Sequence, residues 1–175
     1  MKNIILYMSL VSLLGCSSYV PIKTEEYVDL KRFMGDWYVI ANIPTFIEEG
    51  AHNAVESYAM NKDGSIATTF TFNEDSFNGE KKTYRPTGFV TEDKSNAIWK
   101  MQFLWPFKSD YRILYVDKDY KNTIIGRIKR DYVWIMSRAP SINDDEYNNL
   151  VKIIKSQDYD VTKIERVPQQ PLNER

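Results

Sequence analysis

The chain has 175 residues, of which 43% are hydrophobic, so it is long and apolar enough to form one domain with a sizeable core. Its formal net charge of -1 argues against a nucleic-acid-binding protein, because such proteins usually carry a strong basic excess. The single cysteine, Cys16, excludes an intramolecular disulfide and a cage of thiolate metal ligands.

The N-terminal segment 1–15 has the order of a secretory signal peptide. It begins with one positive charge, Lys2, continues as an apolar stretch and ends in the small residue Gly15. The apolar stretch is too short for a permanent membrane helix, which needs about 20 residues. We therefore expect residues 1–15 to be a signal peptide.

The sequence Leu13-Leu14-Gly15-Cys16 resembles a bacterial lipobox. That resemblance implies that Cys16 is lipidated and anchors the mature protein to a membrane. Because the next residue is Ser17 rather than Asp, it also implies the outer membrane, with the protein facing the periplasm. We expect residues 16–27, which include Pro21, to form a tether between the lipid and the domain.

The segments after the tether are typical of strands. A helical turn is predicted at 29–34, with Asp29 as its cap. Short runs rich in aromatic and β-branched residues follow, and Asp63-Gly64 indicates a hairpin turn. The predicted strands are 37–43, 53–60, 65–73, 81–90, 97–103, 111–117, 122–128 and 132–137. Eight strands in simple succession predict an all-β fold, an up-and-down antiparallel barrel.

In the C-terminal part, the spacing of apolar residues changes from the alternation of strands to the three-and-four spacing of a helix. Tyr147, Leu150, Val151 and Ile154 give one apolar face to a predicted helix at 144–156, with Ser141 or Asn143 as its cap. A short ninth strand is predicted at 161–164. The barrel domain is then expected to cover residues 28–167, followed by a flexible tail at 168–175.

Alternation along the strands predicts which side chains face the barrel interior. The predicted interior and cavity residues are Glu56, Tyr58, Thr68, Phe70, Phe72, Trp99, Met101, Phe103, Tyr111, Ile113, Tyr115, Ile124 and Trp134. On the same argument Arg127 and Lys129 point outward. An eight-stranded barrel has room for packed side chains or for one small ligand, and alternation does not distinguish between the two.

Two features keep alternatives open. Glu56 points inward if it has the same phase as Tyr58; it then pairs with a polar side chain or meets a ligand headgroup, whereas a slipped register leaves it solvated. The aromatic segment Trp105-Pro106-Phe107 forms an exposed patch, covers the barrel mouth or packs under the helix.

Catalytic chemistry has little support in the sequence. The chain has one histidine, His52, in a predicted loop, and no order of Ser, His and Asp, phosphate-binding loop or metal-ligand spacing stands out. The acidic pair Glu48-Glu49 is expected to line a loop. The sequence therefore predicts a protein that is not an enzyme and holds no metal or cofactor.

Three motifs in order resemble the lipocalin family. They are Gly35-Asp36-Trp37 at the first strand, Asp117 to Tyr120 between strands six and seven, and Arg138 after strand eight. Segments 103–107, 130–140 and 159–163 are similar to those of bacterial outer-membrane lipocalins. The resemblance implies a lipocalin barrel in which Trp37 plugs the closed end and Arg138 lies across it.

The same resemblance implies a function. It points to a membrane-anchored protein that binds fatty acids or lysophospholipids and stores or transports them for membrane maintenance, with a homodimer as a further implication. The alternatives are a lipoprotein scaffold with a filled barrel and a binder of another small hydrophobic ligand.

Overall fold

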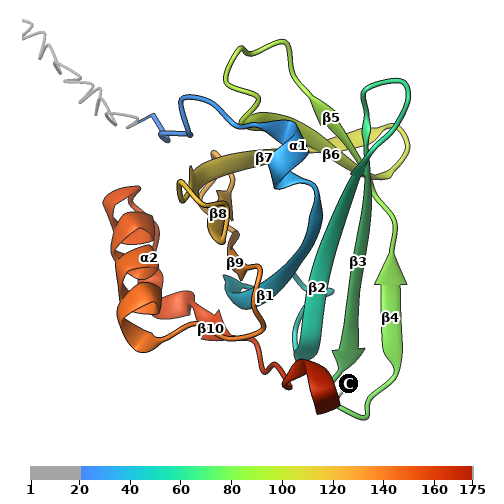
Figure 1. Cartoon of the computed structure of the whole chain (residues 1–175), viewed down its shortest axis with the longest axis vertical. Helices are drawn as coiled ribbons and strands as arrows, with labels where there is room; N and C mark the ends of the chain where they lie inside the picture. The colour runs from blue at the N-terminus through green and yellow to red at the C-terminus, as the bar shows by residue number, and fades with distance from the viewer. Residues whose placement is uncertain (1–20, 175) are drawn as a thin grey trace, which may run out of the picture.

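A computed structural model describes residues 21–174, and within them ten β-strands form one antiparallel sheet (Figure 1). The strands are β1 (Gly35–Ile43), β2 (Ala51–Met60), β3 (Ile66–Glu74), β4 (Lys81–Tyr84), β5 (Thr87–Val90), β6 (Ile98–Leu104), β7 (Phe107–Val116), β8 (Asn122–Gly126), β9 (Val133–Ser137) and β10 (Glu165–Arg166). Since β1 also pairs with β9, the sheet closes on itself. β4 and β5 both pair with β3 and fill one position, so the predicted eight-stranded barrel is confirmed.

Two predicted strands differ from the structure. The segment 81–90 is interrupted at Arg85-Pro86, where proline has no N–H to continue the ladder. The predicted ninth strand at 161–164 is wrong, because Val161–Lys163 forms a 3-10 helix, η1, whose first turn is capped by the Asp160 side chain. The short strand β10 follows η1 and pairs with β1 instead.

Two α-helices occur in the described part of the chain. α1 (Leu30–Phe33) begins after Asp29, whose carboxylate accepts hydrogen bonds from the next turn as predicted. α2 (Asp144–Ser156) has the predicted bounds, and Asn143 rather than Ser141 caps it, in a reciprocal pair with Glu146. α2 lies against the outside of the barrel, whereas α1 leads into β1 (Figure 1).

Buried side chains in residues 21–174 form two clusters on opposite faces of the sheet. The inner cluster fills part of the barrel and includes Trp37 and Trp99, both fully buried. The outer cluster lies between the barrel and α2, where Ile154 is buried. β8 serves both, because Ile125 belongs to the inner cluster and Ile124 to the outer one. This wall of the barrel is therefore apolar on both faces.

The N-terminal segment contacts the barrel earlier than predicted. Ile22 packs in the outer cluster. The backbone N–H of Glu25 donates to the carbonyl of Ile113 at 3.0 Å, and its carboxylate accepts a hydrogen bond from the N–H of Val116 at 2.9 Å. The expected tether at 16–27 therefore ends near residue 22.

The C-terminal tail is also bound to the barrel. The side-chain amide of Gln169 donates to the carbonyl oxygens of Val39 and Ala54 at 2.7 and 3.0 Å, and Asn53 is bonded to Gln170. A short 3-10 helix, η2 (Leu172–Glu174), follows. The predicted flexible tail from residue 168 is therefore wrong for residues 169 and 170.

The strand registers define two ends of the barrel. α1 and the turns 61–65, 91–97 and 117–121 lie at one end, which we call the closed end. The loops 44–50, 75–80, 105–106 and 127–132 lie at the other end, which we call the mouth.

Trp37 and Arg138 seal the closed end. The indole N–H of Trp37 donates to the carbonyl of Phe33 at 2.9 Å. The guanidinium carbon of Arg138 lies 3.8 Å from the centroid of the Trp37 ring, in cation–π contact. Its nitrogens donate to the carbonyl oxygens of residues 32, 33, 34 and 36 at 2.6–3.0 Å. The arrangement that the family motif implied is therefore present.

The other motif residues hold the same end. Gly35 has φ +95, and a Cβ there would lie 3.3 Å from Nη1 of Arg138, so this position needs a glycine. The Asp117 carboxylate accepts three backbone hydrogen bonds within the turn 117–121 and at its end. The hydroxyl of Tyr120 accepts the N–H of Asp29 at 2.7 Å, which ties this turn to α1.

Replacing Arg138 with Ala should lower the free energy of unfolding by about 2–4 kcal/mol, because charge-assisted hydrogen bonds and a cation–π contact are lost. Urea unfolding followed by tryptophan fluorescence measures this change. Lys163→Ala, which removes only an exposed ion pair with Asp160, should unfold at the wild-type urea concentration. An Arg138 variant as stable as the wild type would contradict the role given to this contact.

Candidate ligand-binding cavity

The barrel encloses a cavity of about 580 Å³ that opens at the mouth. This volume lies within the range of about 300–1,000 Å³ that is usual for small-ligand sites. Strands β2, β3, β4, β6, β7 and β9 supply its walls, and the loops 44–50 and 127–132 supply its rim. The walls are mostly apolar and aromatic, so the cavity suits a small hydrophobic ligand.

The predicted interior residues divide into two groups. Those on the cavity wall are Glu56, Phe70, Met101, Phe103, Tyr111 and Trp134. Those buried without lining the cavity are Tyr58, Thr68, Phe72, Trp99 and Ile113. The half of the barrel near Trp37 is therefore a packed core, and the half near the mouth is hollow except where Phe72 fills it. The barrel therefore contains both packed side chains and room for a small ligand, the two possibilities that alternation did not distinguish.

Two predicted interior residues, Tyr115 and Ile124, face the other way. Both pack in the outer cluster under α2. The register of β7 against β8 shifts between Ile113 and Tyr115, which reverses the phase of the side chains beyond it. In β8, alternation is uninformative because both faces are covered by apolar residues. The predicted inward orientation of these two residues is wrong.

Arg127 and Glu48 line the cavity although the sequence placed them outside it. Alternation with Ile124 inside predicts that Arg127 points outward, but Ile125 is the inward residue of β8, and Arg127, two residues further, lies on the same side. Glu48 is 6% exposed, and its carboxylate accepts hydrogen bonds from the indole of Trp134 at 2.7 Å and the hydroxyl of Thr45 at 2.6 Å. The position of Glu48 depends on loop conformation, for which the sequence carries no periodic signal.

Glu56, Tyr58 and Tyr111 form a polar floor at the deep end of the cavity. The Tyr58 hydroxyl donates to the Glu56 carboxylate and is also hydrogen-bonded to the Tyr111 hydroxyl. Burial raises the pKa of Glu56 to about 7, although the hydrogen bond from Tyr58 opposes this shift. Burial likewise raises the pKa of both tyrosines, so they stay protonated. Glu56 therefore points inward, paired with a phenol, and is partly protonated at neutral pH.

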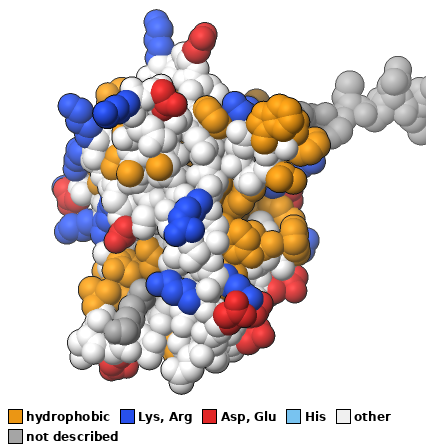
Figure 2. Space-filling view, turned by 90° about the vertical axis from the view of Figure 1, so that its right-hand side faces the viewer, with side chains coloured by type: hydrophobic (Ala, Val, Ile, Leu, Met, Phe, Trp, Pro, Cys, Tyr) orange, Lys and Arg blue, Asp and Glu red, His pale blue; other side chains and the backbone are white. Residues whose placement is uncertain are grey.

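Large hydrophobic side chains surround the mouth. Phe103, on the cavity wall, is 53% exposed, and the adjacent Leu104, Trp105 and Phe107 are more exposed still, as is Phe46 on the loop 44–50. On the face shown in Figure 2, hydrophobic side chains lie in several groups among charged ones. The segment 105–107 is therefore an exposed patch and does not pack under α2.

Residues 21–174 contain neither a candidate metal centre nor a candidate membrane helix. No cluster of three or more His, Cys, Asp or Glu side chains is arranged to hold a metal ion there. None of the helices in this range is long and apolar enough to span a bilayer. Cys16 and the predicted signal peptide lie outside these residues.

A closed antiparallel barrel, sealed at one end by a tryptophan and an arginine and hollow at the other, is the architecture of a lipocalin. The chain belongs to this family, because residues 28–169 match the lipocalin-like domain. The cavity and the family together identify a protein that binds a lipid or another small hydrophobic ligand.

Two relatives show which lipocalins this chain is similar to. The chain is 30% identical over 156 residues to the outer membrane lipoprotein Blc of Citrobacter freundii, with 86% of each protein covered. It is 31% identical over 151 residues to temperature-induced lipocalin-1 of Arabidopsis thaliana, covering 81% of this chain and 80% of that one. The predicted resemblance to Blc-type lipocalins is thus confirmed.

The fold is shared with insecticyanin from the tobacco hornworm Manduca sexta. The two structures align with a TM-score of 0.66, covering 86% of this chain and 91% of that chain. Their sequences are only 15% identical, so this similarity concerns the fold alone.

The Glu56 carboxyl should make stability fall as pH rises. Its pKa is about 7 when folded and 4.5 ordinarily, so its stabilising protonation is complete below pH 4.5 and is lost as pH passes 7. Between pH 5 and pH 8 the wild type should lose about 2–3 kcal/mol that Glu56→Gln does not lose. Urea unfolding at both pH values measures the difference.

The control for this prediction is Glu49→Gln, which removes an exposed carboxyl from the mouth loop. It should keep the wild-type dependence on pH. If Glu56→Gln and the wild type lose equal stability between pH 5 and pH 8, the carboxyl titrates normally and the buried floor is misassigned.

Proposed function

We propose that this protein binds a fatty acid or a lysophospholipid in its cavity and stores or transports it for maintenance of the outer membrane, without catalysis. The observation that carries the proposal is the hollow, apolar half of the barrel, open at the mouth and closed by Trp37 at the other end. A filled barrel, which the alternative scaffold function requires, does not fit this cavity.

The cavity wall is suited to an acyl chain. Phe70, Met101 and Trp134 provide large apolar surfaces, and a methionine adapts its shape to a flexible chain. Acyl chains of different length bury similar surface in such a wall, so we propose a class of ligand and not a single one.

The proposed anchor is Cys16, in agreement with the name of the Blc relatives, outer membrane lipoproteins. Since the chain contacts the barrel from Ile22 onward, an extended tether between these residues spans at most about 20 Å. The barrel would then stay close to the membrane surface, on the periplasmic side, where its ligands occur.

A second candidate, homodimer formation, is favoured by one observation. Leu104, Trp105 and Phe107 expose large hydrophobic surface at the mouth. Exposed patches of this kind are common at protein interfaces. This candidate is compatible with lipid binding and does not replace it.

Phe103→Ala should weaken lipid binding several-fold and leave the fold intact. The Phe103 ring lines the cavity but is 53% exposed, so its loss removes about 1 kcal/mol of contact with an acyl chain and little core packing. Native mass spectrometry of the protein without residues 1–16, titrated with palmitoyl lysophosphatidylglycerol, measures binding. Thermal unfolding measures the fold.

Two variants serve as controls for this experiment. Leu104→Ala removes an exposed side chain that does not line the cavity and should bind as the wild type does. Trp99→Ala should lose about 3–5 kcal/mol of stability, because Trp99 lies in the packed core. If the wild type takes up no acyl lipid, the proposed function is wrong.

Cys16→Ala should release the protein from the membrane. In a Gram-negative host that expresses the full chain, the wild type is expected in the outer-membrane fraction and the variant in the periplasmic extract. Ser17→Ala, which keeps the cysteine, should fractionate as the wild type does. A Cys16 variant that stays in the membrane after signal cleavage would refute lipid anchoring at this residue.

A further inference from the structure

Arg127 places a guanidinium on the cavity wall at the mouth. Its side chain is 19% exposed, and its Nε is buried with no hydrogen-bond partner among the described residues. Its Nη1 lies 3.6 Å from the carboxylate of Asp131, beyond ordinary hydrogen-bond length, and its guanidinium carbon lies 5.2 Å from the Tyr132 ring. The part of the guanidinium that lines the cavity therefore has no hydrogen bond of ordinary length to Asp131 and could donate to a ligand oxygen there.

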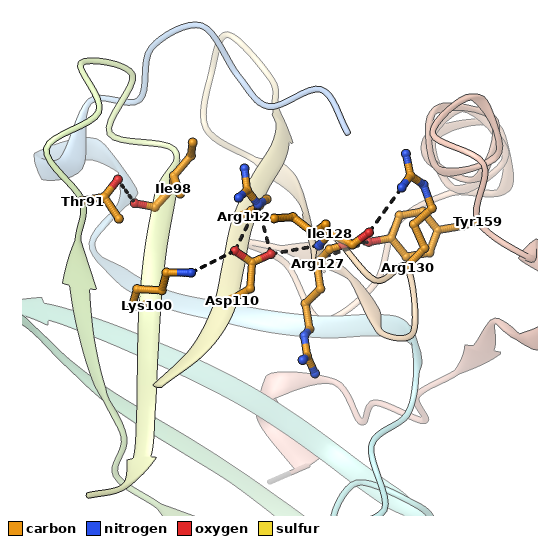
Figure 3. Close-up of polar contacts among 9 residues, drawn as sticks. All are labelled: Thr91, Ile98, Lys100, Asp110, Arg112, Arg127, Ile128, Arg130 and Tyr159. Carbon is orange, nitrogen blue, oxygen red and sulfur yellow. Dashed lines mark hydrogen bonds and ion pairs between the residues drawn. The ribbon is translucent and has the colours of Figure 1, made fainter. Parts of the chain in front are cut away.

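The backbone at Arg127 is held from two sides. The hydroxyl of Tyr159 accepts the N–H of Arg127 at 2.8 Å and donates to its carbonyl at 3.0 Å. The N–H of Ile128 donates to the carboxylate of Asp110 at 2.8 Å. In Figure 3 the side chain of Arg127 points away from these contacts. The guanidinium thus extends from a fixed backbone, which reduces the entropy lost when a ligand binds.

The carboxyl groups on the cavity wall have other partners. Asp110 pairs with a lysine of β6 and an arginine of β7, at 3.6 and 3.0 Å. Glu48 accepts the indole N–H of Trp134, and Glu56 accepts the hydroxyl of Tyr58. None of these bonds involves Arg127, whose ion pair is the 3.6 Å contact with Asp131, a residue that does not line the cavity.

The two ends of the cavity therefore differ in charge. The floor carries Glu56, which would face and repel an anion placed beside it whenever its carboxyl is ionised. The mouth carries Arg127. An amphiphile with a negative headgroup is consequently more stable with its apolar chain toward the floor and its headgroup at the mouth.

We infer that Arg127 binds the oxyanion headgroup, phosphate or carboxylate, of a single-chain lipid whose acyl chain lies in the cavity. This inference rests on the proposed lipid-binding function and adds the orientation of the ligand and the residue that recognises its charge. A guanidinium suits the role because it donates parallel hydrogen bonds to two oxygens of a phosphate or carboxylate.

The test compares three lipids with the same acyl chain at neutral pH: palmitoyl lysophosphatidylglycerol, palmitate and the uncharged monopalmitoylglycerol. The wild type without residues 1–16 should bind at least one charged lipid about tenfold more tightly than the uncharged one. Arg127→Gln should abolish this preference and keep the affinity for monopalmitoylglycerol. The charged lipid that loses affinity identifies the headgroup as phosphate or carboxylate.

Two further variants make the result specific. Lys129→Gln removes the same charge from an exposed position two residues away and should keep the preference. Arg127→Lys keeps the charge but lacks the planar guanidinium, so it should retain part of the preference for charged lipids. The unchanged affinity for monopalmitoylglycerol shows that each variant is folded.

The outcomes separate the inference from the function on which it rests. If monopalmitoylglycerol binds as tightly as both charged lipids, or if Arg127→Gln weakens all three lipids equally, Arg127 does not recognise the headgroup and lipid binding still stands. If none of the three lipids binds, both the inference and the proposed function are wrong.

Discussion

The guanidinium of Arg138 connects the chain after β9 to the end of α1 and the start of β1, because it lies on the Trp37 ring and donates to four carbonyl oxygens there. This contact closes one end of the barrel. The inner cluster, with Trp99 at its centre, packs on that closed end. Because this end is closed, water and ligand reach the apolar cavity from the mouth.

Polar groups are placed along the cavity according to depth. Glu56 and Tyr58 lie at the floor, where burial keeps the carboxyl partly protonated, and Arg127 lies at the mouth, where a headgroup stays near water. The rest of the wall is mostly aromatic and aliphatic. A ligand with one charged end and one apolar end matches this order in a single orientation, which a uniformly apolar cavity would not impose.

Side-chain orientation could be predicted from the sequence in strands that have one face in the barrel interior and one more exposed face. Phe70 and Met101 lie in strands β3 and β6 that alternate cleanly, and both are on the cavity wall as expected. Ile124 was not predictable, because α2 covers the outer face of β8 and the bulge in β7 shifts the register. Arg127 was missed for the same reason, because it shares the inward phase of Ile125. Glu48 was missed because a loop positions it, and loop geometry follows from contacts distant in sequence.

The C-terminal tail determines when β1 completes its hydrogen bonds during folding. β1 pairs not only with β2 but also with β9 and β10, and Gln169 supplies hydrogen bonds to β1 and β2. The first strand of the barrel thus completes its bonding only with residues near the end of the chain. Topologies with such high contact order fold slowly, over about milliseconds to seconds. During that interval β1 remains an open edge, able to pair with another chain, so the last residues of the sequence also protect the first strand from aggregation.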